Sequence, residues 1–141
     1  MIETTGIVEP WLWATLTEDE VLSALVAGHF SATLSPDPLP DPYLTFLMQS
    51  TRDVVGMSGD TISTDNLYIV KAVARSSSWD EVEAIFSRAH ALIHRPNAVM
   101  QSGSGSLTCV REQIVQYPEI DAGVQYRHLG GIYRIRASAD D

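Results

Sequence analysis

Apolar residues recur at helical spacing in two segments of the chain. The first is residues 21–26 (VLSALV), whose apolar positions form one stripe of a helix. Thr17 and Glu20 have the spacing of a capping box just before it, and Gly28 is a common residue after a helix end. This pattern predicts a helix over about residues 18–28.

The second helical segment begins at Ser78, which with Glu81 again has the spacing of a capping box. It ends before Pro96, because proline cannot continue a helix. We therefore predict a helix from Ser78 to about Ile93. Its apolar face consists of Val82, Ile85, Phe86, Ala89 and Ile93.

Four further segments alternate or run apolar in the manner of β-strands. They are YLTFLMQS (43–50), LYIVKAVAR (67–75), LTCVREQIVQY (107–117) and GVQYRHLGGIYRIRA (123–137). The last two are joined by PEIDA and are typical of a long hairpin. Gly130 and Gly131 inside the final strand indicate a bulge, after which the side-chain alternation would flip.

Three connecting segments are rich in proline, glycine or small polar residues. SPDPLPDP (35–42) has four prolines in eight residues, which favours an extended loop. Residues 51–66 contain two glycines and several small polar residues, typical of a long hairpin connection that is partly mobile. MQSGSGS (100–106) has the composition of a flexible linker.

The predicted elements follow the order α-β-β-α-β-β. This order favours an α+β fold, a two-layer sandwich in which a four-stranded, mainly antiparallel sheet has both helices on one face. We expect a single α+β domain over residues 14–141, preceded by an N-terminal arm at residues 1–13. Trp11 and Trp13 in this arm would either pack on the chain's own core or dock on a neighbour.

The open face of this sheet is expected to carry basic residues. Lys71 and Arg75 alternate with the small residues that would face the helices. Arg134 or Arg136 in the final strand would join them. A half-polar sheet face with a free edge is a suitable surface for neighbouring molecules.

The charge along the chain is uneven. Residues 1–60 contain nine acidic residues against Arg52 alone, whereas residues 61–141 contain nine acidic residues against eight basic ones. The formal net charge is −9, which disfavours tight or sequence-specific binding to phosphate backbones. DNA could still pass along such a surface without being held.

Composition places the chain in the ordinary globular class, with 45% hydrophobic and 19% charged residues. No apolar run approaches the roughly 18–20 residues that span a bilayer, and the acidic N-terminus does not resemble an export signal. Cys109 is the single cysteine, so it cannot form an internal disulfide and is expected to be a buried hydrophobic residue.

Two histidines at helical spacing are candidate metal ligands. His90 and His94 lie four residues apart, with Glu83 and Ser87 on the same helix face. The HExxH order is absent and no third ligand is evident, so a solvated polar stripe is the better interpretation. We predict no metal site and no cofactor.

Catalytic arrangements were weighed in the same way. A Ser–His–acid triad could be composed from Ser58, His128 and Asp121, but the chain has no GxSxG elbow, and almost any sequence rich in Ser and Asp permits such a set. The SGSGS run lacks the lysine and the helix of a P-loop. We therefore predict no catalytic residues and no enzymatic activity.

Taken together, several segments resemble the tail-completion or tail-terminator proteins of long-tailed, siphovirus-like bacteriophages. They are the "PY" strand start at Pro42 and Tyr43 after an N-terminal helix, the Ser-rich turn from Arg75 to Ser78, the Ala-, Ile- and Leu-rich helix that follows, and the terminal hairpin ending in YRIRAS. The resemblance covers most of residues 13–137. The loops SPDPLPDP and SGSGS and the tryptophan-containing arm have no counterpart in that pattern.

This resemblance implies a structural virion protein that forms a homo-oligomeric ring, a hexamer, at the head-proximal end of the tail. The ring would cap the tail tube, bind the tail-tube protein and join it to the head–tail connector, with DNA passing through the lumen without specific binding. It would assemble in the host cytoplasm and have no membrane partner. Residues 57–66 and 1–13 would reach adjacent subunits or the tube.

Three alternatives remain open from the sequence. The chain could be a head-side connector or adaptor of the same virion. It could instead be a small α+β enzyme that uses His128 or the face of His90 and His94. A third possibility is a ligand-binding or regulatory α+β module.

Overall fold

The computed structural model describes residues 5–32, 40–59, 61–101 and 105–139. A six-stranded sheet has the order β1-β2-β3-β6-β5-β4. Its strands are β1 (Phe30–Ser31), β2 (Tyr43–Val55), β3 (Thr61–Arg75), β4 (Arg95–Gln101), β5 (Gly105–Asp121) and β6 (Val124–Ala139). All neighbouring strands are antiparallel except β1, which pairs with β2 in parallel.

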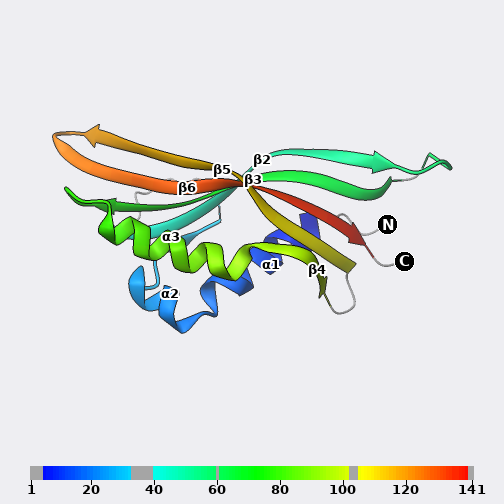
Figure 1. The fold of residues 1–141 in the computed structure, drawn as a ribbon, viewed down its shortest axis with the longest axis horizontal. Coiled ribbons are helices and arrows are strands. Elements are labelled where there is room, and N and C mark those ends of the chain that lie inside the picture. The colour runs from blue at the N-terminus through cyan, green and yellow to red at the C-terminus, as the bar shows by residue number, and fades with distance from the viewer. Residues whose placement is uncertain (1–4, 33–39, 60, 102–104, 140–141) are drawn as a thin grey trace.

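Three helices, α1 (Thr5–Thr17), α2 (Glu20–Leu25) and α3 (Asp80–Ile93), lie on one side of the curled sheet (Figure 1). The long helix α3 packs on β3 and β6, α1 contacts β5 and β6, and α2 packs against the other two helices. The other side of the sheet is not covered by these helices, and we call it the open face.

The predicted four-stranded sheet with two helices is therefore wrong. The sheet is larger because the polar segment 51–66 is mostly strand: Thr51 pairs with Asn66 and Arg52 pairs with Asp65. The small and polar side chains of this segment favour a partly mobile connection, but its backbone extends the two strands begun by apolar residues. The sequence pattern also did not predict β4. The chain after α3 passes directly into this strand, and Pro96 is tolerated in it because β4 lies at the edge of the sheet.

The N-terminal segment differs from the expected arm. From Thr5 onward it belongs to α1, which buries Ile7, Val8 and Leu12 completely or nearly so. Trp11 packs on the chain's own core, whereas Trp13 is 45% exposed and makes an edge contact with Phe30.

Neither helix start forms the predicted capping box. Asp19 caps α2 by accepting a hydrogen bond from the Leu22 backbone N–H at 2.9 Å, while the Thr17 hydroxyl donates to the Trp13 carbonyl. The α2 helix is accordingly shorter than the predicted 18–28 segment. At α3 the Ser78 hydroxyl accepts from the Asp80 N–H at 3.1 Å.

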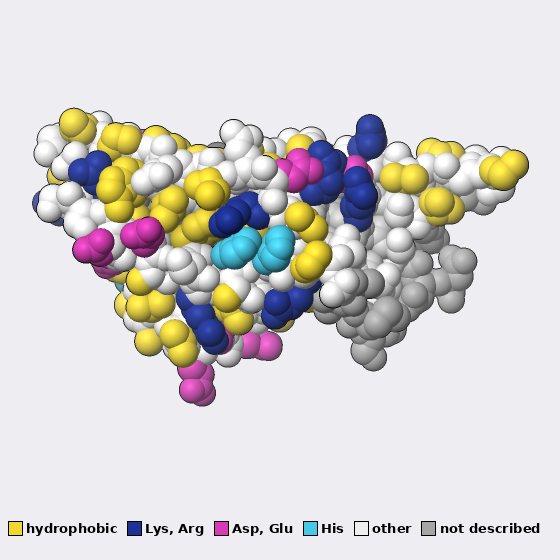
Figure 2. Space-filling view, in the orientation of Figure 1, with side chains coloured by type: hydrophobic (Ala, Val, Ile, Leu, Met, Phe, Trp, Pro, Cys, Tyr) yellow, Lys and Arg dark blue, Asp and Glu magenta, His cyan; other side chains and the backbone are white. Residues whose placement is uncertain are grey.

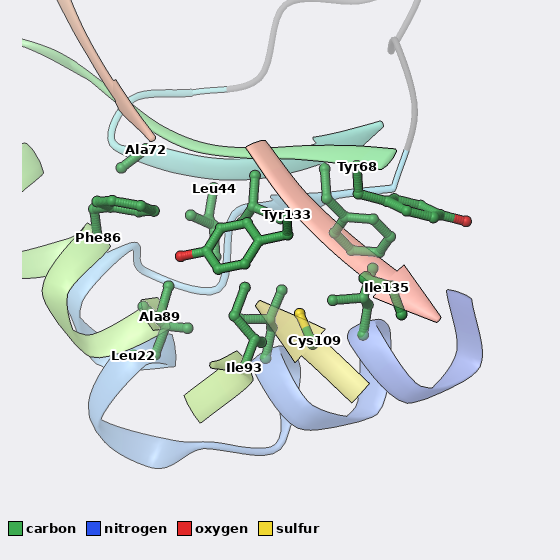
Figure 3. Close-up of a cluster of buried hydrophobic side chains, with 14 of the residues drawn as sticks. Leu22, Leu44, Tyr68, Ala72, Phe86, Ala89, Ile93, Cys109, Tyr133 and Ile135 are labelled. Atoms are coloured by element: carbon green, nitrogen blue, oxygen red, sulfur yellow. The ribbon is translucent and has the colours of Figure 1, made fainter. Parts of the chain in front are cut away.

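The core lies between the helices and the sheet (Figure 3). The whole predicted apolar face of the second helix is buried there, which confirms that part of the pattern. Figure 3 shows Phe86, Ala89 and Ile93 of α3 opposite sheet residues that include Tyr133 and Cys109. Burial raises the pKa of the Cys109 thiol to about 12, consistent with its expected role as a buried hydrophobic residue.

Gly130 and Gly131 do not form a bulge. The pairing of β6 with β3 runs through both residues without a break, and the nearby irregularity lies in β5 between Arg111 and Gln113. A Cβ on Gly130 would lie 2.2 Å from the Val70 carbonyl oxygen and 2.4 Å from Lys71 Cβ. Glycine is required at this position by the close approach of β3.

The SPDPLPDP segment and the SGSGS run fall largely outside the described residues. The last hairpin is longer than predicted, because PEIDA continues β5 as far as Asp121. Ala122 and Gly123, both with positive φ, form the two-residue turn into β6.

Candidate assembly surfaces

Two hairpins project from opposite ends of the molecule. The β2–β3 hairpin extends from one end and the β5–β6 hairpin from the other (Figure 1). Both carry exposed apolar side chains, and hydrophobic side chains gather at the two ends of the long axis in Figure 2. These residues are Val54, Val55, Met57 and Ile62 on the first hairpin, and Tyr117 and Ile120 on the second. Ile114 and Val110 are exposed farther along β5, away from its turn. Exposed apolar clusters of this kind are typical of protein contact sites.

The same hairpins leave two sheet edges open. β1 pairs with β2 only at Leu44 and Thr45, and β4 pairs with β5 only as far as Cys109. In the part of the chain that the structure describes, the outer edges of β2 and β5 beyond these points have no strand partner. Unpaired strand edges can add a strand from another chain.

A charged cluster occupies the open face where the β2–β3 hairpin leaves the body of the protein. At its centre is Asp65, whose side chain is only 4% exposed. Arg134 Nη1 lies 2.7 Å from Asp65 Oδ1, and Arg52 and Arg136 lie 3.5 and 3.9 Å from Oδ2. Figure 2 shows basic and acidic side chains gathered in this region.

Arg134 is held from two sides. Its Nε donates to Glu112, and a second contact joins its Nη2 to Glu112 Oε2 at 3.4 Å. The hydrogen bonds to Glu112 and then to Asp65 raise the pKa of Arg134. The cluster therefore has one fixed guanidinium and two that are more exposed.

A second cluster on the open face surrounds a buried histidine. His128 is 5% exposed and its ring stacks on Tyr117 at 4.5 Å between centroids. His128 Nε2 lies 3.2 Å from Glu119 Oε1, and Lys71 Nζ donates to the Tyr117 hydroxyl at 2.9 Å. Burial, followed by the charge of Lys71, lowers the pKa of His128, and Glu119 opposes this effect.

The structure places His90 and His94 side by side, with ring centroids 4.7 Å apart. His90 Nδ1 lies 2.8 Å from the Tyr133 hydroxyl, and His94 Nδ1 accepts the Arg111 backbone N–H at 3.4 Å. Burial is the main cause that lowers the pKa of His90. Within the described ranges, no group of three or more potential ligands is arranged to hold a metal ion.

The candidate triad is not assembled. Ser58 lies at the turn of the β2–β3 hairpin, whereas His128 pairs with Val73 at the far part of β3. Thr61, the first residue of β3 after this turn, and Val73 are twelve residues apart, so at ~3.3 Å per residue roughly 40 Å of strand separates the turn that holds Ser58 from His128. Asp121 lies at the end of β5, beyond His128.

The sequence predicted the basic character of the open face but missed Asp65. The pairing of Arg52 with Asp65 on neighbouring strands would have indicated the role of Asp65. That pairing can be predicted only if the register of the β2–β3 hairpin is known. None of the described helices is long and apolar enough to cross a bilayer.

Comparison with known proteins finds a shared fold without a shared sequence family. No family model matches the chain, and no curated protein matches it. Among solved structures, it is similar to a chain of the virion of a native gene transfer agent (GTA) particle. The TM-score is 0.72 at 16% identity, covering 98% of this chain and 99% of the other. The chain thus has, from end to end, the fold of a component of a gene transfer agent virion.

Proposed function

We propose that the protein is a structural component of a virion, and specifically a ring-forming tail terminator that caps the tail tube and joins it to the head connector. The observation that carries the proposal is the end-to-end fold likeness to a chain of a gene transfer agent virion. The sequence resemblance to tail-terminator proteins, which rests on different features, supports the same class.

The geometry is suited to a closed ring. A ring made of identical contacts needs two different surfaces on each subunit, one for each neighbour. The β2–β3 and β5–β6 hairpins provide such surfaces at opposite ends of the sheet, and both carry exposed apolar side chains. Six copies would form a ring whose lumen lets DNA pass.

The negative net charge of the chain supports the passage of DNA without retention. Specific and non-specific DNA affinity both come largely from neutralised phosphates. A chain of net charge −9 offers few cations for this purpose. The tail-tube protein and the head–tail connector are the expected partners in the virion.

The test is reconstitution with tail-tube subunits of the same virion. Native mass spectrometry should give a hexamer, either alone or on the tube, and negative-stain electron microscopy should show the ring at one end of tubes whose growth has stopped. Binding to the head connector without binding to the tube would instead indicate a head-side adaptor. A chain that stays monomeric with both partners would overturn the proposal.

A further inference from the structure

The open face differs in charge from the rest of the molecule. Opposite residues of paired strands point to the same face, so the register assigns five of the nine basic residues to the open face. These are Arg52, Lys71, Arg75, Arg134 and Arg136, and the acidic residues on that face are Asp65, Glu112, Glu119 and Asp121. Elsewhere, the described chain carries Glu9, Glu18, Asp19, Glu20, Asp41, Asp53, Asp80, Glu81 and Glu83 against Arg88, Arg95, Arg111 and Arg127. A weakly basic face therefore opposes a strongly acidic back.

Two arginines on this face have unused hydrogen-bonding capacity. The side chains of Arg52 and Arg136 are 78% and 67% exposed, and both approach the same oxygen of Asp65. A guanidinium has five N–H donors, so one shared carboxylate oxygen at 3.5 and 3.9 Å occupies few of them. Both groups are oriented by the buried Asp65 and can accept a further carboxylate in the bidentate geometry that arginine favours.

The surroundings of these arginines indicate a protein partner. Val54 and Val110 are 38% and 36% exposed on the same face. A shallow pocket of about 240 Å³, lined by Thr108, Val110, Glu112, Arg134 and Arg136, lies beside them. Arginine among apolar residues is typical of protein interfaces, whereas a DNA-binding face needs more cations that are not already paired with carboxylates.

We propose that the part of the open face around Arg52 and Arg136 binds the acidic back of a second copy of this chain, at the exposed first turn of α3. This inference rests on the proposed function and names the surfaces that its ring would use. The first turn of α3 presents Asp80, Glu81 and Glu83, all exposed. These carboxylates would occupy the N–H donors that Asp65 leaves unused on the two arginines.

The charge distribution makes this contact directional. Two open faces would bring like charges together, and so would two acidic backs, each at a cost. Only an open face against a back is favourable, and that contact is heterologous. Repeated from copy to copy, such a contact does not stop at a dimer, and it forms the proposed ring where the rotation between neighbouring copies closes.

The experiment compares three variants by native mass spectrometry at low and high salt, alone and with tube subunits. Arg52→Glu with Arg136→Glu should raise the concentration required for assembly by roughly tenfold or more, most strongly at low salt. Arg52→Lys with Arg136→Lys, the matched control, keeps the charge but loses the paired donors, so it should assemble better than the Glu variant and less well than the unmodified chain. Adding Glu81→Arg and Glu83→Arg to the Glu variant should restore assembly.

The outcomes separate this inference from the proposed function. Rings that form normally with Glu at positions 52 and 136, in a chain whose thermal unfolding is unchanged, would overturn the inference and leave the proposed function intact. Loss of assembly without rescue by the α3 variant would also overturn it, because the partner surface would then be different. Duplex DNA retention that falls with the Glu variant while assembly persists would assign the arginines to nucleic acid. Failure of the unmodified chain to assemble in any condition would remove both proposals.

Discussion

Arg88 of α3 binds Asp19 through two hydrogen bonds, from Nη2 to Oδ1 at 2.6 Å and from Nε to Oδ2 at 2.9 Å. The same carboxylate caps α2 by accepting the Leu22 N–H. The side chain of Asp19 thus caps the start of α2 and ties this helix to α3. The bonds from Arg88 and then from Leu22 lower the pKa of Asp19 from 3.8 to about 2.

Replacing Asp19 with Ala should destabilise the protein by about 1 kcal/mol or more at neutral pH, because the cap and the bond to Arg88 are both lost. Since the folded pKa is lowered, the stabilisation is present above pH 3.8 and is lost as the pH falls toward about 2. Chemical denaturation of both proteins between pH 6 and pH 2 measures this. A difference that stays constant across that range would contradict the assignment, and Glu18→Ala, at an exposed position, is the control.

Leu12→Ala should cost about 2–5 kcal/mol, the usual range for a buried leucine. Leu12 is a fully buried residue of α1. It lies within residues 1–13, which the sequence predicts to be an arm, and it contributes to the core. Val21→Ala, at a position 54% exposed, should change the unfolding free energy by less than about 0.5 kcal/mol. Urea denaturation compares the two, and equal effects would mean that α1 does not pack as described.

Gly130→Ala should destabilise the protein by about 3 kcal/mol or more, since the added methyl group would overlap the backbone of β3 at Val70 and Lys71. Gly131→Ala is the informative comparison. Its Cβ would lie 2.9 Å from the flexible Arg111 side chain and 3.1 Å from the Gln113 carbonyl oxygen, so small shifts relieve the contacts at a cost of about 1 kcal/mol. If thermal denaturation ranks the two variants in the opposite order, the register of β3 and β6 is not as described.

His128 should make stability decrease in mild acid. Its folded pKa is lowered by burial, so above the ordinary value of about 6.5 the histidine is neutral in both states and contributes no pH dependence. As the pH falls below that value, the unfolded chain gains a proton that the folded chain resists, and stability declines. The decline should be smaller in His128→Phe, which keeps an aromatic ring against Tyr117. Identical pH profiles between pH 8 and pH 5 would show that the ring titrates freely in the fold.

The strongest sequence patterns were those with one consistent periodicity. The apolar face of the 78–93 helix was predicted residue by residue, because each member points into the core at a 3.6-residue spacing. The centres of the four predicted strands were also placed correctly, since they carry apolar residues that the helices cover. The surplus of basic residues on the open face followed from the same alternation.

The features of the fold that the sequence did not predict depend on contacts with residues far away in the chain. Thr51 to Val55 form a strand because they pair with Thr61 to Asn66. The β-branched Thr51, Val54 and Val55 favour a strand, but the charged pair between them and the glycines that follow favour a connection. Gly130 and Gly131 looked like a bulge, yet their role is set by the distance to β3. The same holds for Asp65, whose three arginines come from two other strands.

The sequence by itself determined the acidic balance of the chain, its buried helix face and the order of its central strands, because these depend on composition and on local periodicity. The tertiary structure decided the extent of the sheet, the packing of α1 into the core, the separation of Ser58 from His128 and the gathering of Arg52, Arg134 and Arg136 around Asp65. Those features depend on which strands pair and in which register, and pairing is fixed only when the whole core is buried at once.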